Sequence, residues 1–182
     1  AQCLGDAGLL DLARADMSPV DPNVATNLRA VLHRLADAHS DDRFRVLFDL
    51  PDDLCTVVIP EASLDAVLST FIGNSRQAGA SMIRFEATNV QGNLALRISD
   101  NGPGIPDEQR AAVFDPFFTT KGPGEGTGMG LAISYNIMTE HEGRIEVESS
   151  SSGTCFSVVL PLREPPSEPK PDPKIHQPST PS

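Results

Sequence analysis

The sequence predicts an α+β fold: a two-layer sandwich in which helices cover one face of a mixed, mostly antiparallel sheet. Segments with alternating apolar residues come in pairs joined by short turns, which is typical of β-hairpins. Between these pairs lie segments with apolar residues every three or four positions, which is typical of amphipathic helices. Hairpins with helices between them favour this layered architecture, and 182 residues are enough for the core of one domain.

The N-terminal part predicts two helices separated by a break. Residues 1–17 have the pattern of the last turns of a helix whose beginning has been cut away. After the break, Asp21 is a good N-cap and Pro22 a good first helical residue. We therefore expect a helix from there to about His39. Its apolar face repeats at helical spacing and consists of Val24, Leu28, Val31, Leu32 and Leu35.

The middle of the chain predicts strands on either side of a second helix. Short strands are expected at 43–50 and 55–59, followed by a helix from about Glu61 to Gly79. Alternating apolar residues on both sides of a Gly92-Asn93 turn then predict a hairpin. The inward-facing positions of that hairpin are Ile83, Phe85, Ala87, Leu94, Leu96 and Ile98.

The last third predicts a short helical piece, a third helix and a final hairpin. These are expected at 107–113, at about 127–141, and at 144–148 paired with 154–160. Residues 164–182 are dense in proline and contain one aliphatic residue, Ile175. Such a segment buries too little apolar area to offset its ordering entropy, so we expect a disordered tail or linker. The folded domain is therefore predicted to span 18–163.

Charge and composition exclude several classes of protein. The chain carries 14 Lys and Arg against 25 Asp and Glu, a formal charge of −11. An excess of acid offers no electrostatic footprint for nucleic acid or for an anionic membrane surface. No apolar run is long enough to cross a bilayer and no signal peptide is visible, so we expect a cytoplasmic domain. Because the sequence does not begin with Met, we expect it to be part of a longer protein.

The first segment with residues suited to ligand binding is Asp100-Asn101-Gly102-Pro103-Gly104-Ile105-Pro106. A carboxylate at the end of a strand can accept a hydrogen bond from an exocyclic amine. Two glycines just after it allow the backbone to approach a flat ligand closely. The alternative is a plain tight turn, because Asn, Gly and Pro are the usual turn residues.

The second segment is Gly124-Glu125-Gly126-Thr127-Gly128-Met129-Gly130-Leu131, which leads into the predicted third helix. Alternate glycines before a helix N-terminus expose several N–H groups, and the helix dipole adds partial positive charge, so the place suits phosphate. It matches neither the P-loop nor the dinucleotide fingerprint. The alternative is a mobile glycine-rich loop.

The third segment contains Asn74, which lies at the margin of the apolar face of the second helix. Its amide oxygen is a suitable ligand for Mg²⁺, which takes oxygen donors and keeps waters and substrate phosphates as its other ligands. The alternative is an ordinary surface residue near a helix end.

Taken in order, these segments resemble the catalytic and ATP-binding domain of bacterial sensor histidine kinases. The resemblance covers about residues 18–163 and rests on four boxes of that family: Asn74, DNGPGIP, FDPFFTTK and GTGMGL. It implies the Bergerat ATP-binding fold, shared with gyrase, MutL and the heat-shock chaperone ATPases. It also implies that residues 1–17 are the end of a dimerisation helix.

The resemblance further implies a set of site residues. Asp100 is expected to hold the adenine amine, assisted by Thr154, and Asn74 to carry Mg²⁺. Lys121 is expected on the lid over the site, with a catalytic role shared with Asn74. The residues implied to contact ATP are Asn74, Gln77, Ala78, Asp100, Gly102, Gly104, Ile105, Phe117, Lys121, Gly126, Thr127, Gly128, Met129, Gly130, Leu131 and Thr154.

The implied activity is transfer of the ATP γ-phosphoryl group to a histidine on a dimerisation domain absent from this chain. We expect little turnover from the chain alone. A response regulator receiver domain is the implied indirect partner. The parent kinase is expected to be a homodimer, and membrane anchoring of the parent is left open. His141 is followed by Glu142 but also by Gly143, and we interpret it as a helix C-terminal residue rather than as the phosphoacceptor.

Two departures from the family pattern leave an alternative open. Thr70 stands where the family usually has a second Asn, and Gln77 where many nitrogen-regulator-type members have Asp. A degenerate ATP-sensing or partner-docking module of the same fold is therefore the alternative function. A self-contained ATPase is disfavoured, because gyrase-like relatives carry a general-base Glu at the position of Thr70.

Overall fold

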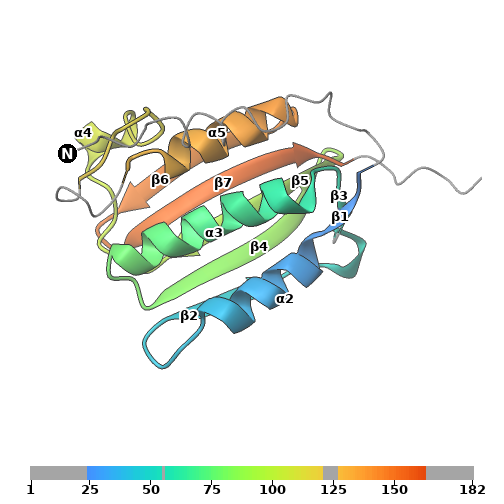
Figure 1. Cartoon of the computed structure of the whole chain (residues 1–182), viewed down its shortest axis with the longest axis horizontal. Helices are drawn as coiled ribbons and strands as arrows, with labels where there is room; N and C mark the ends of the chain where they lie inside the picture. Colours follow the sequence, from blue (N-terminus) through green and yellow to red (C-terminus); the bar gives the residue numbers. More distant parts are fainter. Residues whose placement is uncertain (1–23, 55, 121–126, 163–182) are drawn as a thin grey trace, which may run out of the picture.

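The computed structural model describes residues 24–54, 56–120 and 127–162, and all statements below concern these residues (Figure 1). A five-stranded sheet has the order β2-β4-β5-β7-β6, and a separate two-stranded sheet pairs β1 with β3. Only the β2–β4 pair of the large sheet is parallel. The strands are β1 Thr26–Asn27, β2 Arg45–Asp49, β3 Thr56–Val57, β4 Met82–Val90, β5 Asn93–Asp100, β6 Arg144–Ser150 and β7 Gly153–Pro161. The predicted mixed, mostly antiparallel sheet is thereby confirmed.

Three helices lie side by side over one face of this sheet (Figure 1). They are α2 Leu28–His39, α3 Glu61–Gln77 and α5 Gly130–Glu140, with the short α4 Asp107–Arg110 and a 3-10 turn at Asp52–Leu54 in the connections. Alternate strand residues such as Phe85 and Ile98 point into the core, where they meet the apolar faces of α2 and α3. None of the helices in the described ranges has the length and apolar character that a bilayer crossing requires.

Strand register brings distant residues together at one end of the sheet. Along β4 and β5, Ile83 pairs with Asp100, and along β5 and β7, Ser99 pairs with Cys155. Asp100 therefore ends β5 directly beside Thr154 of β7, although 54 positions separate them in the chain. This end of β5 lies against the C-terminal half of α3, since the Ser75 hydroxyl of that helix donates to Asp100.

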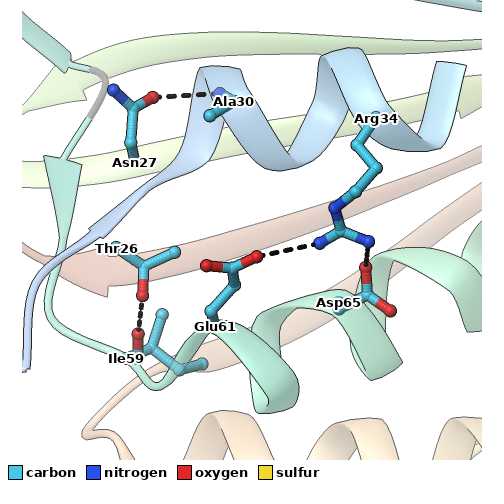
Figure 2. A network of polar contacts seen from close by, with 7 residues as sticks. All are labelled: Thr26, Asn27, Ala30, Arg34, Ile59, Glu61 and Asp65. Carbon is cyan, nitrogen blue, oxygen red and sulfur yellow. Dashed lines mark hydrogen bonds and ion pairs between the residues drawn. The ribbon is translucent and has the colours of Figure 1, made fainter. Parts of the chain in front are cut away.

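The predicted start of the first helix is wrong by several residues. The helix begins at Leu28, where the Asn27 side chain accepts a hydrogen bond from the backbone N–H of Ala30. Residues 26 and 27 form β1 instead, and the Thr26 hydroxyl donates to the Ile59 carbonyl at 2.5 Å (Figure 2). Pairing with β3 therefore takes precedence over helix extension. The expected cap at Asp21 and Pro22 lies outside the described residues.

An ion-pair network joins α2 to α3 (Figure 2). The guanidinium of Arg34 donates to Asp65 at 2.7 Å and to Glu61 at 3.1 Å, two acids one turn apart on α3. Hydrogen bonding and charge from Asp65 raise the pKa of Arg34 above its ordinary value. The three side chains are partly or largely exposed to solvent, so the network adds little to the stability of the fold.

Aromatic rings connect α5 and the segment before it to the sheet. Phe156 of β7 lies 4.8 Å from Phe71 of α3 and 6.2 Å from Phe114, measured between ring centroids. Phe114 also contacts Tyr135 of α5 at 5.5 Å. Tilted and edge-on ring pairs at such distances are favourable contacts. The first phenylalanine of the FDPFF run therefore anchors this segment to the core.

His141 is the C-cap of α5, as expected. Burial lowers its pKa below the ordinary value and outweighs the raising effect of Glu140. Its Nδ1 atom is buried without a hydrogen-bond partner among the described residues. The backbone N–H of His141 caps α5 by donating to the Ile137 and Met138 carbonyls, and burial of the imidazole favours its neutral form.

This environment predicts a pH dependence of stability. The folded pKa of His141 lies below the unfolded one, so the unfolded chain binds the proton first and acid favours unfolding. The contribution of His141 is complete above about pH 6.5 and declines as the pH falls below that value. In urea unfolding at about pH 7.5 and pH 5.5, His141→Gln should lose less free energy of unfolding between the two conditions than the wild type. Equal losses in the two proteins would contradict the assignment.

Candidate functional site

A cavity of about 680 Å³ lies between α3, the end of β5, residues 103–120 and the start of α5. Its size is that of a small-molecule site. The second half of α3 supplies one wall, the first glycine segment a second, and the N-terminus of α5 a third. Phe156 of β7 and Val113 contribute apolar surface. Segments far apart in the sequence thus converge on one concave place.

The cavity brings together most of the residues predicted for the site. The predicted residues that line it are Asn74, Gln77, Ala78, Asp100, Gly104, Ile105, Thr127, Gly128, Gly130, Leu131 and Thr154. Gly102, Phe117 and Met129 do not line it; Phe117 is 75% exposed, and Phe118 stands at the wall instead. Lys121 and Gly126 lie outside the described residues.

The Asp100 carboxylate is fixed in the cavity by three hydrogen bonds. Its Oδ1 atom accepts the backbone N–H of Gly102 at 2.9 Å and that of Thr154 at 3.2 Å. Its Oδ2 atom accepts the Ser75 hydroxyl at 2.8 Å. An ionised carboxylate offers about four acceptor positions, so one position on Oδ2 remains for a ligand that donates a hydrogen bond.

Ser75 is a site residue that the sequence analysis missed. It is 4% exposed and lines the cavity one position after Asn74. A serine in an amphipathic helix does not by itself indicate a binding site. The signal that identifies it is spatial: the hydroxyl meets a carboxylate 25 positions later in the chain.

The first glycine segment is held against the β6–β7 hairpin. The backbone N–H of Ile105 donates to the Ser149 hydroxyl at 2.7 Å. Asn101 turns away from the cavity, and its side-chain oxygen accepts the N–H groups of Ser81 and Met82. Gly104 has φ +80°, and a Cβ there would overlap the Ser150 carbonyl oxygen. This segment is therefore more than a plain turn, because its backbone is fixed from two sides.

The second glycine segment brings the start of α5 close to α3. A Cβ on Gly130 would lie 3.0 Å from the Thr70 methyl group, so the glycine permits this approach. The Thr70 hydroxyl donates back to the Ala66 carbonyl at 2.8 Å and leaves its methyl group toward α5. Gly128 has φ +67° and packs on the Phe117 backbone. No side chain caps α5, and its first residues, Gly130 and Leu131, line the cavity. The positive end of the helix dipole therefore lies at this wall.

The donor set at this end fits a divalent cation bound jointly with phosphate. Asn74 lines the cavity, and its side-chain amide has no hydrogen-bond partner among the described residues. Within these residues there is also no cluster of three or more acidic, His or Cys side chains that could hold a metal alone. One amide oxygen, completed by phosphate oxygens and water, is an arrangement that Mg²⁺ accepts.

Comparisons with known proteins agree with this geometry. A family model described as histidine kinase-, DNA gyrase B- and HSP90-like ATPase matches residues 60–164. The C4-dicarboxylate transport sensor protein DctB of Rhizobium meliloti is 40% identical over 121 residues, covering 63% of this chain and 19% of that protein. The sensory histidine kinase/phosphatase NtrB of Azospirillum brasilense is 40% identical over 104 residues, covering 57% of this chain and 24% of that protein.

Among solved structures, the nucleotide-free catalytic domain of histidine kinase ThkA is similar with a TM-score of 0.67 and 25% identity. The likeness covers 76% of this chain and 95% of that domain. The matched family region contains α3, both hairpins and the whole described cavity wall. The chain therefore belongs to the histidine kinase-, DNA gyrase B- and HSP90-like ATPase family, as an ATP-binding catalytic domain of the sensor histidine kinase type.

Proposed function

We propose that this cavity binds ATP and that the domain transfers the γ-phosphoryl group to a histidine on a dimerisation domain outside this chain. One observation carries the proposal. A carboxylate with a single open acceptor position and the uncapped N-terminus of α5 line the same cavity. The first suits the amine of adenine, and the second suits a chain of phosphates.

The residues of this chain act by positioning and by neutralising charge. Asp100 accepts a hydrogen bond from the adenine amine, and Ile105 and Phe118 supply apolar wall. The backbone N–H groups of Thr127, Gly128 and Gly130, which line the cavity, donate to phosphate oxygens. Asn74 lines the cavity and would supply one oxygen ligand to Mg²⁺, which would neutralise phosphate charge there. In the transfer, the bond between the γ-phosphorus and the bridging oxygen of ADP breaks while a nitrogen–phosphorus bond to the acceptor imidazole forms. Such transfers depend mainly on alignment and electrostatics.

The wider assembly is proposed by analogy with the named relatives, of which this chain spans 19% and 24%. The acceptor histidine lies on a dimerisation domain, the parent kinase is a homodimer, and a response regulator receiver domain takes the phosphoryl group in turn. We place this domain in the cytoplasm. Residues 1–17 are proposed as the end of the dimerisation helix, residues 18–163 as the catalytic domain, and 164–182 as a tail or linker.

Two measurements test the proposal together. Calorimetry should show saturable binding of ADP and of a non-hydrolysable ATP analogue to this chain. Radiolabelled ATP with a matching dimerisation domain should then yield acid-labile phosphohistidine, and the chain alone should release little phosphate. Absence of nucleotide binding would refute the site. Binding without phosphohistidine would favour an ATP-sensing module instead.

Replacing Asn74 with Ala should weaken only the part of nucleotide binding that depends on Mg²⁺. Loss of one ligand oxygen is expected to lower affinity for the ATP analogue about tenfold in Mg²⁺, and to leave affinity in EDTA unchanged. Asn136→Ala is the matched control, because Asn136 is an exposed asparagine on α5 that does not line the cavity. An equal loss of affinity with and without Mg²⁺ would show that Asn74 does not bind the metal.

A further inference from the structure

Ser75 supplies the only side-chain hydrogen bond to the Asp100 carboxylate among the described residues. The other two donors are backbone N–H groups, which any residue except proline provides at those positions. The hydroxyl oxygen lies 2.8 Å from Oδ2, and the serine is 4% exposed. A bond of this kind to an ionised group is among the stronger ones in proteins. Of the three hydrogen bonds to Asp100, the one from Ser75 can therefore be removed by a side-chain substitution.

The bond decides which acceptor position of Asp100 remains open. Oδ1 already receives two N–H groups, from Gly102 and Thr154. Ser75 fills one of the two positions on Oδ2, which leaves one for a ligand in the cavity that both residues line. A carboxylate held in this way accepts one further hydrogen bond and donates none. It can therefore accept a hydrogen bond from a ligand amine, whereas a ligand carbonyl oxygen at the same place would be repelled.

We propose that Ser75 is a positioning residue for purine discrimination: its hydroxyl fixes Asp100 so that the site selects a purine with an exocyclic amine over one with hydrogen or a carbonyl there. The inference rests on the proposed nucleotide site and deepens it. Ser75 contacts the Asp100 carboxylate, at the end of the cavity proposed for the base. Its effect is confined to the base end, whereas Asn74, the preceding residue, serves the other end of the same cavity.

The test uses three diphosphates that differ only at the base: ADP, purine riboside diphosphate without the amine, and inosine diphosphate with a carbonyl. Calorimetry compares the wild type with Ser75→Ala. We expect Ser75→Ala to lower ADP affinity about tenfold and to leave affinity for the purine riboside diphosphate within about twofold. The preference for ADP over inosine diphosphate should narrow. Ser75→Thr, which keeps a hydroxyl, should restore the preference for ADP.

Ser134→Ala is the matched control. Ser134 is another buried helical serine, and its hydroxyl donates to the Gly130 carbonyl at 3.0 Å rather than to Asp100. This variant should keep the wild-type ratio of ADP to purine riboside diphosphate affinity. If Ser75→Ala lowers both affinities by the same factor, or neither, the positioning role is refuted while the nucleotide site stands. If the wild type binds none of the three diphosphates, the proposed function fails, and the role of Ser75 with it.

Discussion

Replacing Asp100 with Asn is expected to lower ADP affinity by about a hundredfold or more while leaving the fold intact. The ligand amine needs an acceptor, and three protein groups already donate to this carboxylate: the Ser75 hydroxyl and the N–H groups of Gly102 and Thr154. The amide oxygen of Asn satisfies the two N–H groups on one side. Its NH₂ group then takes the place of Oδ2 and faces the ligand amine. Both groups are hydrogen-bond donors, so they repel each other instead of bonding.

The fold should tolerate this change because it conserves volume and most contacts. Asn keeps an acceptor toward Gly102 and Thr154, and the Ser75 hydroxyl can rotate to accept a hydrogen bond from the new NH₂ group. Asp100 is also only partly buried at the end of β5. We therefore expect the free energy of unfolding to fall by about 1 kcal/mol or less, which leaves the loss of binding as the main effect.

Calorimetry with ADP and urea unfolding of the same samples measure the two effects. Asp37→Asn is the matched control: the same chemical change on the exposed side of α2, which does not line the cavity. It should leave ADP affinity unchanged. If Asp100→Asn binds ADP as the wild type does, Asp100 does not hold the base, and the orientation of the nucleotide in the cavity has to be reassigned.

The parts of this protein that sequence reasoning predicted are those encoded by local patterns. Alternation around Gly92 and Asn93 places Phe85 and Ile98 in a hairpin, and the structure pairs them. The two glycine segments and Asn74 were predicted for the site because each lies in a short run of consecutive residues that resembles a motif of the family. The cavity then follows from the fold, since these segments lie at the ends of neighbouring elements.

The features that were missed depend on contacts between distant residues. Thr26 joins β1 because it pairs with Val57, and Asn27 next to it caps the helix. Asn27 is a local signal for this start, but the pairing with Val57 is not encoded locally. Ser75 becomes part of the site only through the register that puts Asp100 beside α3. Phe117 and Phe118 are equivalent in sequence, but Phe117 has φ +67° and its ring is 75% exposed. The Phe117 N–H also donates to the Gly128 carbonyl at 3.0 Å, a contact between residues 11 positions apart that no local pattern encodes.

Replacing Gly104 with Ala is expected to lower the free energy of unfolding by about 3 kcal/mol or more and to abolish ADP binding. Two costs add at this position. The first is the positive φ of +80°, which an L side chain adopts at a cost of about 1–2 kcal/mol. The second is steric: the new Cβ would overlap the Ser150 carbonyl oxygen, at 2.9 Å from its carbonyl carbon and 3.0 Å from Ser149 Oγ. Backbone, not a flexible side chain, has to move.

Gly79→Ala separates the two costs. Gly79 follows α3 with φ +86°, and a Cβ there would meet nothing within 4 Å. This variant therefore reports the conformational cost alone, about 1 kcal/mol, and should still bind ADP. The difference between the two variants in urea unfolding, at unchanged m-value, measures how closely the base-binding segment is packed against the β6–β7 hairpin. Equal destabilisation by the two substitutions would show that this packing is loose, and that Ser149 and Ser150 do not fix the segment that follows Asp100.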